Sequence, residues 1–349
     1  MTEWSRPDGD KLRCTLCPRD CRLSEGQRGM CFVRQRQGDR IVSTAYGKAS
    51  GFALDPIEKK PLNHFYPGSS VLSFGTAGCN LACKFCQNWD ISKSRDIERL
   101  SDEATPEAIA AAALRAGARS IAFTYNDPTI FPEYAMDVAD AAHAAGLATV
   151  AVSAGYIYPE PRAELYAKID AANIDLKAFT DEFYWKQAAA HLGPVKDTLR
   201  YLVHETRVWT EITTLLIPTL NDSDRELHEL AQWVAAELGV DVPLHFSAFH
   251  PDYKLLDLPA TPPATLTRAR RIAMAEGLRY VYTGNVHDPE GDQTLCPSCG
   301  TAVISRDWYE ILSAQLTSAG ACARCGTGIP GRFAEAIGNF GRKRMRVVV

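Results

Sequence analysis

Residues 71–86 read VLSFGTAGCNLACKFC, and this stretch decides the fold. Its first five residues form an apolar, β-rich run that predicts a strand, and Cys79, Cys83 and Cys86 follow closely. Three thiolates cannot complete a four-cysteine site, and no fourth cysteine lies nearby. In a four-iron cluster, three cysteines would leave one iron free to bind a substrate or cofactor. A zinc site completed by a distant histidine is the alternative.

Downstream of this stretch, short β-rich runs alternate with helical stretches. A helix is expected from Thr105 as N-cap, with Pro106 at its first position and Gly117 at its end. Further helices are expected over 131–145, 223–238 and 263–276. Strands are expected over 71–75, 120–125, 148–153, 173–178, 208–217, 244–248 and 280–283. This alternation indicates βα units around a parallel sheet.

Two observations favour a barrel over an open doubly wound sheet. No Gly-x-Gly-x-x-Gly turn follows the first strand, so the dinucleotide-binding fingerprint is absent. Polar residues also recur where successive strands end, the face that carries the active site in barrels. These residues are Cys79, Asn126, Asp127, Ser153, Asp175, Lys177, Thr213, Thr214, His245 and Asn285. We therefore expect an α/β fold, a partial or near-closed (β/α) barrel.

The chain has 349 residues, of which 46% are hydrophobic, and a formal charge of −4. This composition is that of a globular protein, and it offers no broad basic surface for nucleic acid. The first residues lack a signal peptide, and no apolar run is long enough for a membrane span. We expect a cytoplasmic protein, in which eleven cysteines indicate metal or redox chemistry rather than disulfides.

The remaining eight cysteines form two groups of four outside the βα region. Cys296, Cys299, Cys322 and Cys325 form two Cys-x-x-Cys-Gly turns, a zinc-ribbon or rubredoxin-like pattern for a structural zinc or iron ion. A catalytic dithiol is the alternative. Cys14, Cys17, Cys21 and Cys31 would bind zinc, which we favour, or an auxiliary iron–sulfur cluster. We expect metal-binding segments at 1–70 and 290–349 around a barrel at 71–289.

The segment Cys79 to Cys86, with aromatic Phe85 before the last cysteine, resembles the signature of radical S-adenosylmethionine (SAM) enzymes. The resemblance implies a [4Fe-4S] cluster whose fourth iron chelates SAM. It also implies reductive cleavage of SAM to a 5′-deoxyadenosyl radical, which abstracts a hydrogen atom from a substrate. A low-potential electron donor, such as flavodoxin or ferredoxin, would be needed. The chain would then be an oxidoreductase or an activating-enzyme-like protein.

Other segments resemble the same superfamily. Asn126 and Asp127 stand where it carries a Gly-Gly-Glu-Pro-like segment facing the SAM amino group, although an Asn-Asp-Pro turn is the alternative. Ser153 and Gly155 resemble the segment that contacts the ribose. With Phe85, Thr213 and Asn285 these residues form the expected SAM-binding set. The expected catalytic residues are Asp175 and Lys177, which resemble the Asp-Leu-Lys of activating enzymes, and His245; a structural Asp175–Lys177 ion pair is the alternative.

Nearly the whole chain resembles the radical SAM member of the AmmeMemoRadiSam system. The matching segments include residues 14–21, 55–62, 86–90, 245–251 and 282–286. The resemblance implies Memo- and Ammecr-type partner proteins, and a substrate that is either a small molecule or a protein. One alternative is an activase that acts on a glycyl-radical enzyme. A second is a non-catalytic metal-binding module that never turns SAM over.

Overall fold

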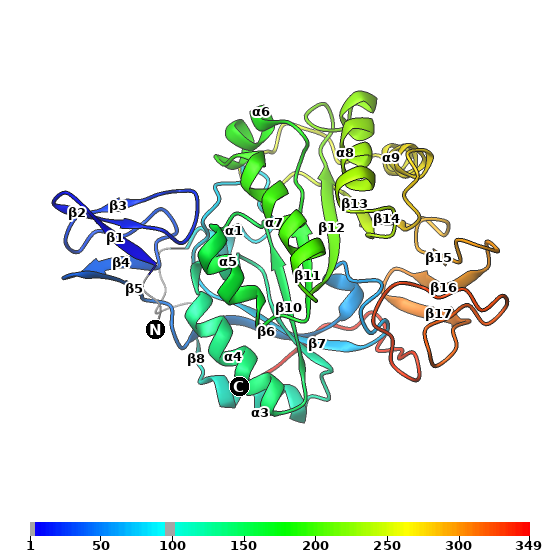
Figure 1. Cartoon of the computed structure of the whole chain (residues 1–349), viewed down its shortest axis with the longest axis horizontal. Coiled ribbons are helices and arrows are strands. Elements are labelled where there is room, and N and C mark those ends of the chain that lie inside the picture. Colours follow the sequence, from blue (N-terminus) through cyan, green and yellow to red (C-terminus); the bar gives the residue numbers. More distant parts are fainter. Residues whose placement is uncertain (1–3, 95–101) are drawn as a thin grey trace.

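The computed structural model describes residues 4–94 and 102–349. Its centre is a ten-stranded sheet (Figure 1). The strands are β6 (Lys48–Pro56), β7 (Ser70–Gly75), β8 (Asp102–Glu103), β9 (Ser120–Phe123), β10 (Ala148–Ser153), β11 (Ala171–Asp175), β12 (Trp209–Leu216), β13 (Leu244–Ala248), β14 (Val281–Gly284) and β18 (Met345–Arg346). They follow the order β14-β13-β12-β11-β10-β9-β7-β6-β18, with β8 paired to β6.

Seven strands of this sheet, from β7 to β14, pair in parallel as the βα pattern predicted. Strand β6 adds to β7 in antiparallel orientation, and β18 adds to β6 in the same way. Both strands come from outside residues 71–289, the segment expected to form the barrel. The sheet therefore includes strands that this segment does not contain. The strand order is an open path that begins at β14 and ends at β18. The expected partial (β/α) barrel is therefore confirmed.

Helices connect the parallel strands and pack against them. They are α1 (Trp89–Ser92), α3 (Pro106–Arg115), α4 (Pro132–Ala144), α5 (Pro159–Tyr166), α6 (Asp181–Phe183), α7 (Leu192–Glu205), α8 (Asp224–Glu237) and α9 (Pro263–Ala275). Thr105 caps α3 as expected, because its hydroxyl oxygen accepts a hydrogen bond from the Ala108 amide at 3.2 Å. In the part of the chain that the structure describes, no helix is long and apolar enough to cross a membrane.

Some predicted boundaries differ from the structure. The strand expected over 120–125 ends at Phe123, and Tyr125 has a left-handed backbone (φ 69°) that turns the chain out of the sheet. The strand expected over 173–178 runs instead from Ala171 to Asp175. Helices α5 and α7 were not predicted; the hydrophobic positions of α7 pack against β12.

Two small cysteine-containing modules lie at opposite ends of the molecule (Figure 1). The N-terminal module contains β1 (Ser5–Asp8), β2 (Lys11–Cys14), β3 (Arg22–Leu23) and the hairpin of β4 (Arg34–Gln37) and β5 (Arg40–Ser43). The C-terminal module is an antiparallel sheet of β15 (Thr294–Leu295), β16 (Ala302–Asp307) and β17 (Glu310–Ala314).

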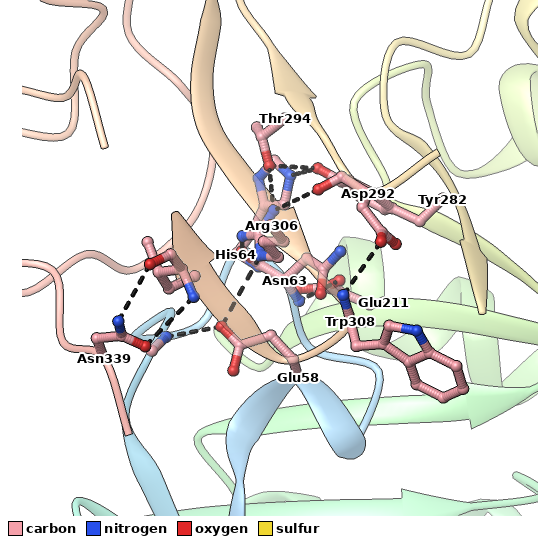
Figure 2. A network of polar contacts seen from close by, with 12 residues as sticks. Glu58, Asn63, His64, Glu211, Tyr282, Asp292, Thr294, Arg306, Trp308 and Asn339 are labelled. Carbon is pink, nitrogen blue, oxygen red and sulfur yellow. Dashed lines mark hydrogen bonds and ion pairs between the residues drawn. The ribbon is translucent and has the colours of Figure 1, made fainter. Parts of the chain in front are cut away.

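A buried polar network joins the C-terminal module to the barrel (Figure 2). The Arg306 guanidinium, on β16, donates to the backbone oxygen of Asn63 at 2.8 Å. The Glu211 carboxylate, on β12, accepts the backbone amides of Asn63 and His64 at 3.0 and 2.8 Å. The His64 ring lies 2.6 Å from the Tyr282 hydroxyl on β14. These contacts fix the loop after β6 against residues near the amino ends of the parallel strands.

Candidate active site and metal centres

The three central cysteines line a cavity of about 220 Å³ at the carboxyl ends of the parallel strands. The loop from β7 to Cys79 follows a path that two glycines permit. A side chain at Gly75 would meet the Thr124 carbonyl oxygen at 2.4 Å, and Gly78 has φ +90°. Because of these residues, Cys79 comes close to the end of β9. Other residues of this cavity are Phe85, Gln87, Asn88, Tyr125, Asn126, Asp127, Ala154, Asp175, Lys177, Thr213 and Ser247.

Burial favours the protonated form of the thiols at this site. Burial raises the pKa of Cys79 to about 12, although the nearby Lys93 ammonium opposes the shift. Burial also raises the pKa of Cys83, against the opposing charge of Lys177. A thiol with such a pKa stays protonated near neutral pH unless a bound metal displaces the proton. The three cysteines that line this cavity match the number of protein ligands of a [4Fe-4S] cluster with one iron open.

The predicted catalytic pair Asp175 and Lys177 lies against this site. The Lys177 ammonium nitrogen is 2.8 Å from the Asp175 carboxylate, so the structural ion pair considered above is present. Burial alone would lower the pKa of Lys177, but Asp175 and the Cys83 sulfur outweigh it and hold that pKa above its usual range. Lys177 therefore keeps its positive charge beside the cysteines.

Asn126 and Asp127, expected to bind SAM, already have partners within the chain. The Asn126 amide donates to the backbone oxygens of Thr76 and Gly78 at 2.8 and 2.9 Å, and so holds the loop before Cys79. The Asp127 carboxylate accepts the Ser153 hydroxyl at 3.0 Å and the Ala154 amide at 2.8 Å. Both residues line the cavity.

The structure places Ser153 and Gly155 behind the cavity wall rather than on it. The Ser153 hydroxyl is taken by Asp127, and Gly155 packs against Ile174 and Thr198. Of the segment that resembles the ribose contact, Ala154 is the residue that lines the cavity. This position could not be identified from residue type, because alanine has no polar group to mark it.

A second cavity, of about 320 Å³, adjoins the first. The two share the side chains of Gln87, Asn88, Tyr125, Thr213 and Ser247. His245 and Asn285 line this second cavity and not the first. The His245 ring lies 2.7 Å from the buried Glu211 carboxylate, and the Asn285 amide donates to Ser247 at 2.9 Å.

The second cavity is also lined by charged residues that precede β7, Glu58, Lys59 and Lys60. The buried Lys60 ammonium lies 2.9 Å from the Asp55 carboxylate, and Lys59 lies 3.2 Å from the same group. The Tyr125 hydroxyl donates to Asp55 at 3.3 Å. Burial lowers the pKa of Lys60 to about 8, although Asp55 opposes the shift. Glu211 was not predicted, because it comes from a strand interior, 34 residues from its partner His245.

The C-terminal cysteines form a compact group. The Cys296 and Cys325 sulfurs lie 3.5 Å apart, the Cys299 and Cys322 sulfurs lie 3.7 Å apart, and all four are within 4.8 Å of one another. A Zn–S bond of about 2.3 Å places tetrahedral thiolates about 3.8 Å apart. Hydrogen bonding with Thr301 lowers the pKa of Cys299 to about 6, which favours the thiolate. This group fits one metal ion.

The N-terminal cysteines come together around a different small cavity. Cys14, Cys17, Cys21 and Cys31 all line it, together with Arg34, which lies 2.6 Å from the Glu133 carboxylate. Two arginines close to these cysteines in the sequence bond elsewhere: Arg22 pairs with Asp8, and Arg28 donates to the Phe32 backbone oxygen.

Comparison with known proteins agrees with this geometry. Residues 74–231 match the model of the radical SAM superfamily. The chain is 44% identical, over 303 residues, to the uncharacterized protein MJ0808 of Methanocaldococcus jannaschii, covering 87% of this chain and 90% of the relative.

Solved structures share the fold at low identity. A radical SAM methyltransferase from Sphaerobacter thermophilus matches with TM-score 0.51 and 19% identity over 63% of this chain and 67% of its own. SuiB of Streptococcus suis bound to S-adenosylmethionine matches with TM-score 0.51 and 13% identity over 66% of this chain and 53% of its own. With these matches, the chain belongs to the radical SAM superfamily and is an enzyme of that kind.

Proposed function

We propose that this enzyme cleaves SAM in the three-cysteine cavity and acts on a substrate held in the adjoining cavity. The observation that carries the proposal is the shared wall of the two cavities, built by Gln87, Asn88, Tyr125, Thr213 and Ser247. When bound, the [4Fe-4S] cluster and SAM would supply a 5′-deoxyadenosyl radical that takes a hydrogen atom from the substrate. Because the two cavities adjoin, the substrate would lie close to SAM, and the hydrogen atom would move from substrate to radical over a short distance away from water.

The residues of this chain would orient the two ligands. Cys79, Cys83 and Cys86 would hold the cluster, and Phe85 and Thr213, which line the same cavity, would contact SAM. Lys177 would place a positive charge near the negatively charged cluster or the SAM carboxylate. Asn126 and Asp127 would act chiefly by holding the walls in place.

In the second cavity, His245 and Asn285 face the substrate. Glu211 accepts a hydrogen bond from His245 and fixes the ring orientation, so His245 is suited to hold or move a substrate proton. The cavity is bordered by Lys59, Lys60, Glu58 and Asp292, so it suits a polar substrate. We further infer that the enzyme serves the AmmeMemoRadiSam system, with Memo- and Ammecr-type partners and a flavodoxin- or ferredoxin-type electron donor. Zinc is the ion proposed for the C-terminal site.

The test is anaerobic reconstitution with iron and sulfide, followed by dithionite and SAM, with 5′-deoxyadenosine measured by chromatography. We expect product from the wild type and none from Cys83→Ala. His245→Gln, which changes only the second cavity, should still form 5′-deoxyadenosine. Equal product from Cys83→Ala, or none from the reconstituted wild type, would overturn the proposal.

A further inference from the structure

The two groups of four cysteines differ in how far apart their sulfur atoms lie. The C-terminal sulfurs are all within 4.8 Å of one another. Among the described residues, no three sulfurs of Cys14, Cys17, Cys21 and Cys31 come that close together, although all four line one cavity. A single zinc ion needs thiolates about 3.8 Å apart. The N-terminal arrangement is therefore too wide for one zinc ion.

The spacing of the N-terminal sulfur atoms can be compared with that of the three central cysteines in the same chain. Cys79, Cys83 and Cys86 line one cavity, and they also do not form a group within 4.8 Å in the described chain. These residues lie within the region that matches the radical SAM superfamily, and the comparison rests on the function proposed above, in which they hold the [4Fe-4S] cluster. A four-iron cluster separates its cysteine ligands, because each thiolate binds a different iron at a corner of the cluster.

We propose that Cys14, Cys17, Cys21 and Cys31 bind a second, fully ligated [4Fe-4S] cluster. This replaces the zinc ion that the spacing of these cysteines in the sequence favoured. The four sulfurs come from the end of β2, the turn before β3 and the loop before β4, so they surround the cavity from several sides. The cavity that they line is small, about 20 Å³.

The surroundings of this cavity suit a buried anionic cluster. Cys14, Cys17 and Cys31 are buried, and Arg34 is only 2% exposed. The Arg34 Nε–H has no hydrogen-bond partner, although buried donors are nearly always paired. Arg34 lines the cavity, so sulfide or thiolate sulfur atoms of a cluster would supply the missing acceptor. Hydrogen bonds of this kind to sulfur also tune the potential of iron–sulfur clusters.

The second cluster would be a direct neighbour of the first. Asn80 lines the N-terminal cavity, and the residue before it, Cys79, lines the radical SAM cavity. The carbonyl oxygen of Cys31 packs so closely on Gly78 that an added side-chain carbon there would lie 2.1 Å from it. Arg19 holds the two segments together, since its guanidinium donates to the Asn80 backbone oxygen at 2.7 Å.

The test removes the first cluster and asks what metal remains. The full chain carrying Cys79→Ala, Cys83→Ala and Cys86→Ala is purified without oxygen and reconstituted with iron and sulfide. Iron, acid-labile sulfide and zinc per chain are then measured, together with the Mössbauer spectrum. We expect about four irons and four sulfides per chain in the triple variant, with a [4Fe-4S] spectrum. Adding Cys14→Ser and Cys17→Ser should remove this iron.

A control variant at the C-terminal site and the iron content of the wild type complete the test. Cys299→Ser with Cys322→Ser, in the wild-type chain, should lower the metal bound at the C-terminal site and leave the iron content unchanged. If the triple variant does not fold, wild-type iron is informative by itself, because two clusters require about eight irons per chain and one requires about four. A triple variant that holds zinc at the N-terminal cysteines and no iron would overturn the proposal. A reconstituted wild type that holds only one cluster, with about four irons per chain, would also overturn the proposal.

Discussion

The Lys177 ammonium nitrogen lies 2.8 Å from the Asp175 carboxylate, and both side chains line the cavity that contains Cys83. Asp175 and the Cys83 sulfur together keep Lys177 charged despite its burial. The pair therefore places a fixed positive charge beside the proposed cluster, with a carboxylate that holds it in position.

Replacing the Lys177 ammonium should slow SAM cleavage more than it destabilises the fold. Lys177→Met should lower the rate of 5′-deoxyadenosine formation about 10- to 100-fold, as expected for a group that supports metal ligands. The rate is measured after reconstitution, with iron content checked. Lys168→Met is the matched control, because Lys168 is half exposed and pairs with Asp140 on the surface. Equal rates in the two variants would contradict a role for Lys177.

Asp127 should matter mainly for stability. Its buried carboxylate accepts hydrogen bonds from Ser153 and from the backbone amides of Thr129 and Ala154. Asp127→Asn replaces one accepting carboxylate oxygen with an NH₂ group, which cannot accept a hydrogen bond from these donors. The change should lower the free energy of unfolding by about 1–3 kcal/mol. Urea denaturation followed by circular dichroism measures the change. Asp140→Asn, on the surface, should lie within about 0.5 kcal/mol of wild type; a similar value for Asp127→Asn would count against its anchoring role.

Loss of the C-terminal metal should loosen the module that it holds. Cys299→Ser with Cys322→Ser should bind about one metal ion fewer per chain and melt at lower temperature, because metal binding contributes directly to folding. Plasma mass spectrometry and differential scanning calorimetry measure the two effects. The control is Ser298→Ala, at an exposed position between Cys296 and Cys299, which should alter neither. Unchanged metal content in the double variant would show that these four cysteines do not form the site.

His64 should make the protein less stable in acid. Burial lowers the pKa of His64 to about 4, against the opposing charge of Glu211, whereas unfolded histidine has a pKa of about 6.5. Between these values the unfolded chain binds a proton that the folded chain does not, so the free energy of unfolding falls as pH falls. The fall from pH 7 to pH 5 should be roughly 1–2 kcal/mol smaller in His64→Gln.

The control for this prediction is His204→Gln, because His204 is exposed at the end of α7 and bonds to the Glu237 backbone oxygen. Its pH profile of unfolding, measured with urea at each pH, should follow wild type. A His64→Gln profile that also follows wild type would show that His64 protonation does not contribute.

The parts of the fold that depend on local patterns could be predicted from the sequence. The strands over 148–153 and 244–248 have the predicted bounds, because apolar runs there end at clear turn residues. The addition of β6 and β18 to the sheet could not be predicted, since their pairing partners are set by tertiary packing rather than by residue pattern.

The same distinction holds within the site. The three cysteines could be found by their spacing alone. Asn126 and Asp127 were identified by position, but their existing partners Thr76 and Ala154 lie 50 and 27 residues away, beyond the reach of local patterns. The distances between sulfur atoms that separate zinc from a cluster likewise depend on how the N-terminal loops fold together.

Electron paramagnetic resonance of the reduced enzyme tests most directly whether the three-cysteine site leaves an iron open to SAM. The measurement uses the Cys14→Ser, Cys17→Ser variant, in which the proposed second cluster cannot form. We predict a [4Fe-4S] signal whose g values shift when SAM is added, and its loss when Cys83→Ala is introduced as well. A cluster signal that SAM leaves unchanged would contradict the account.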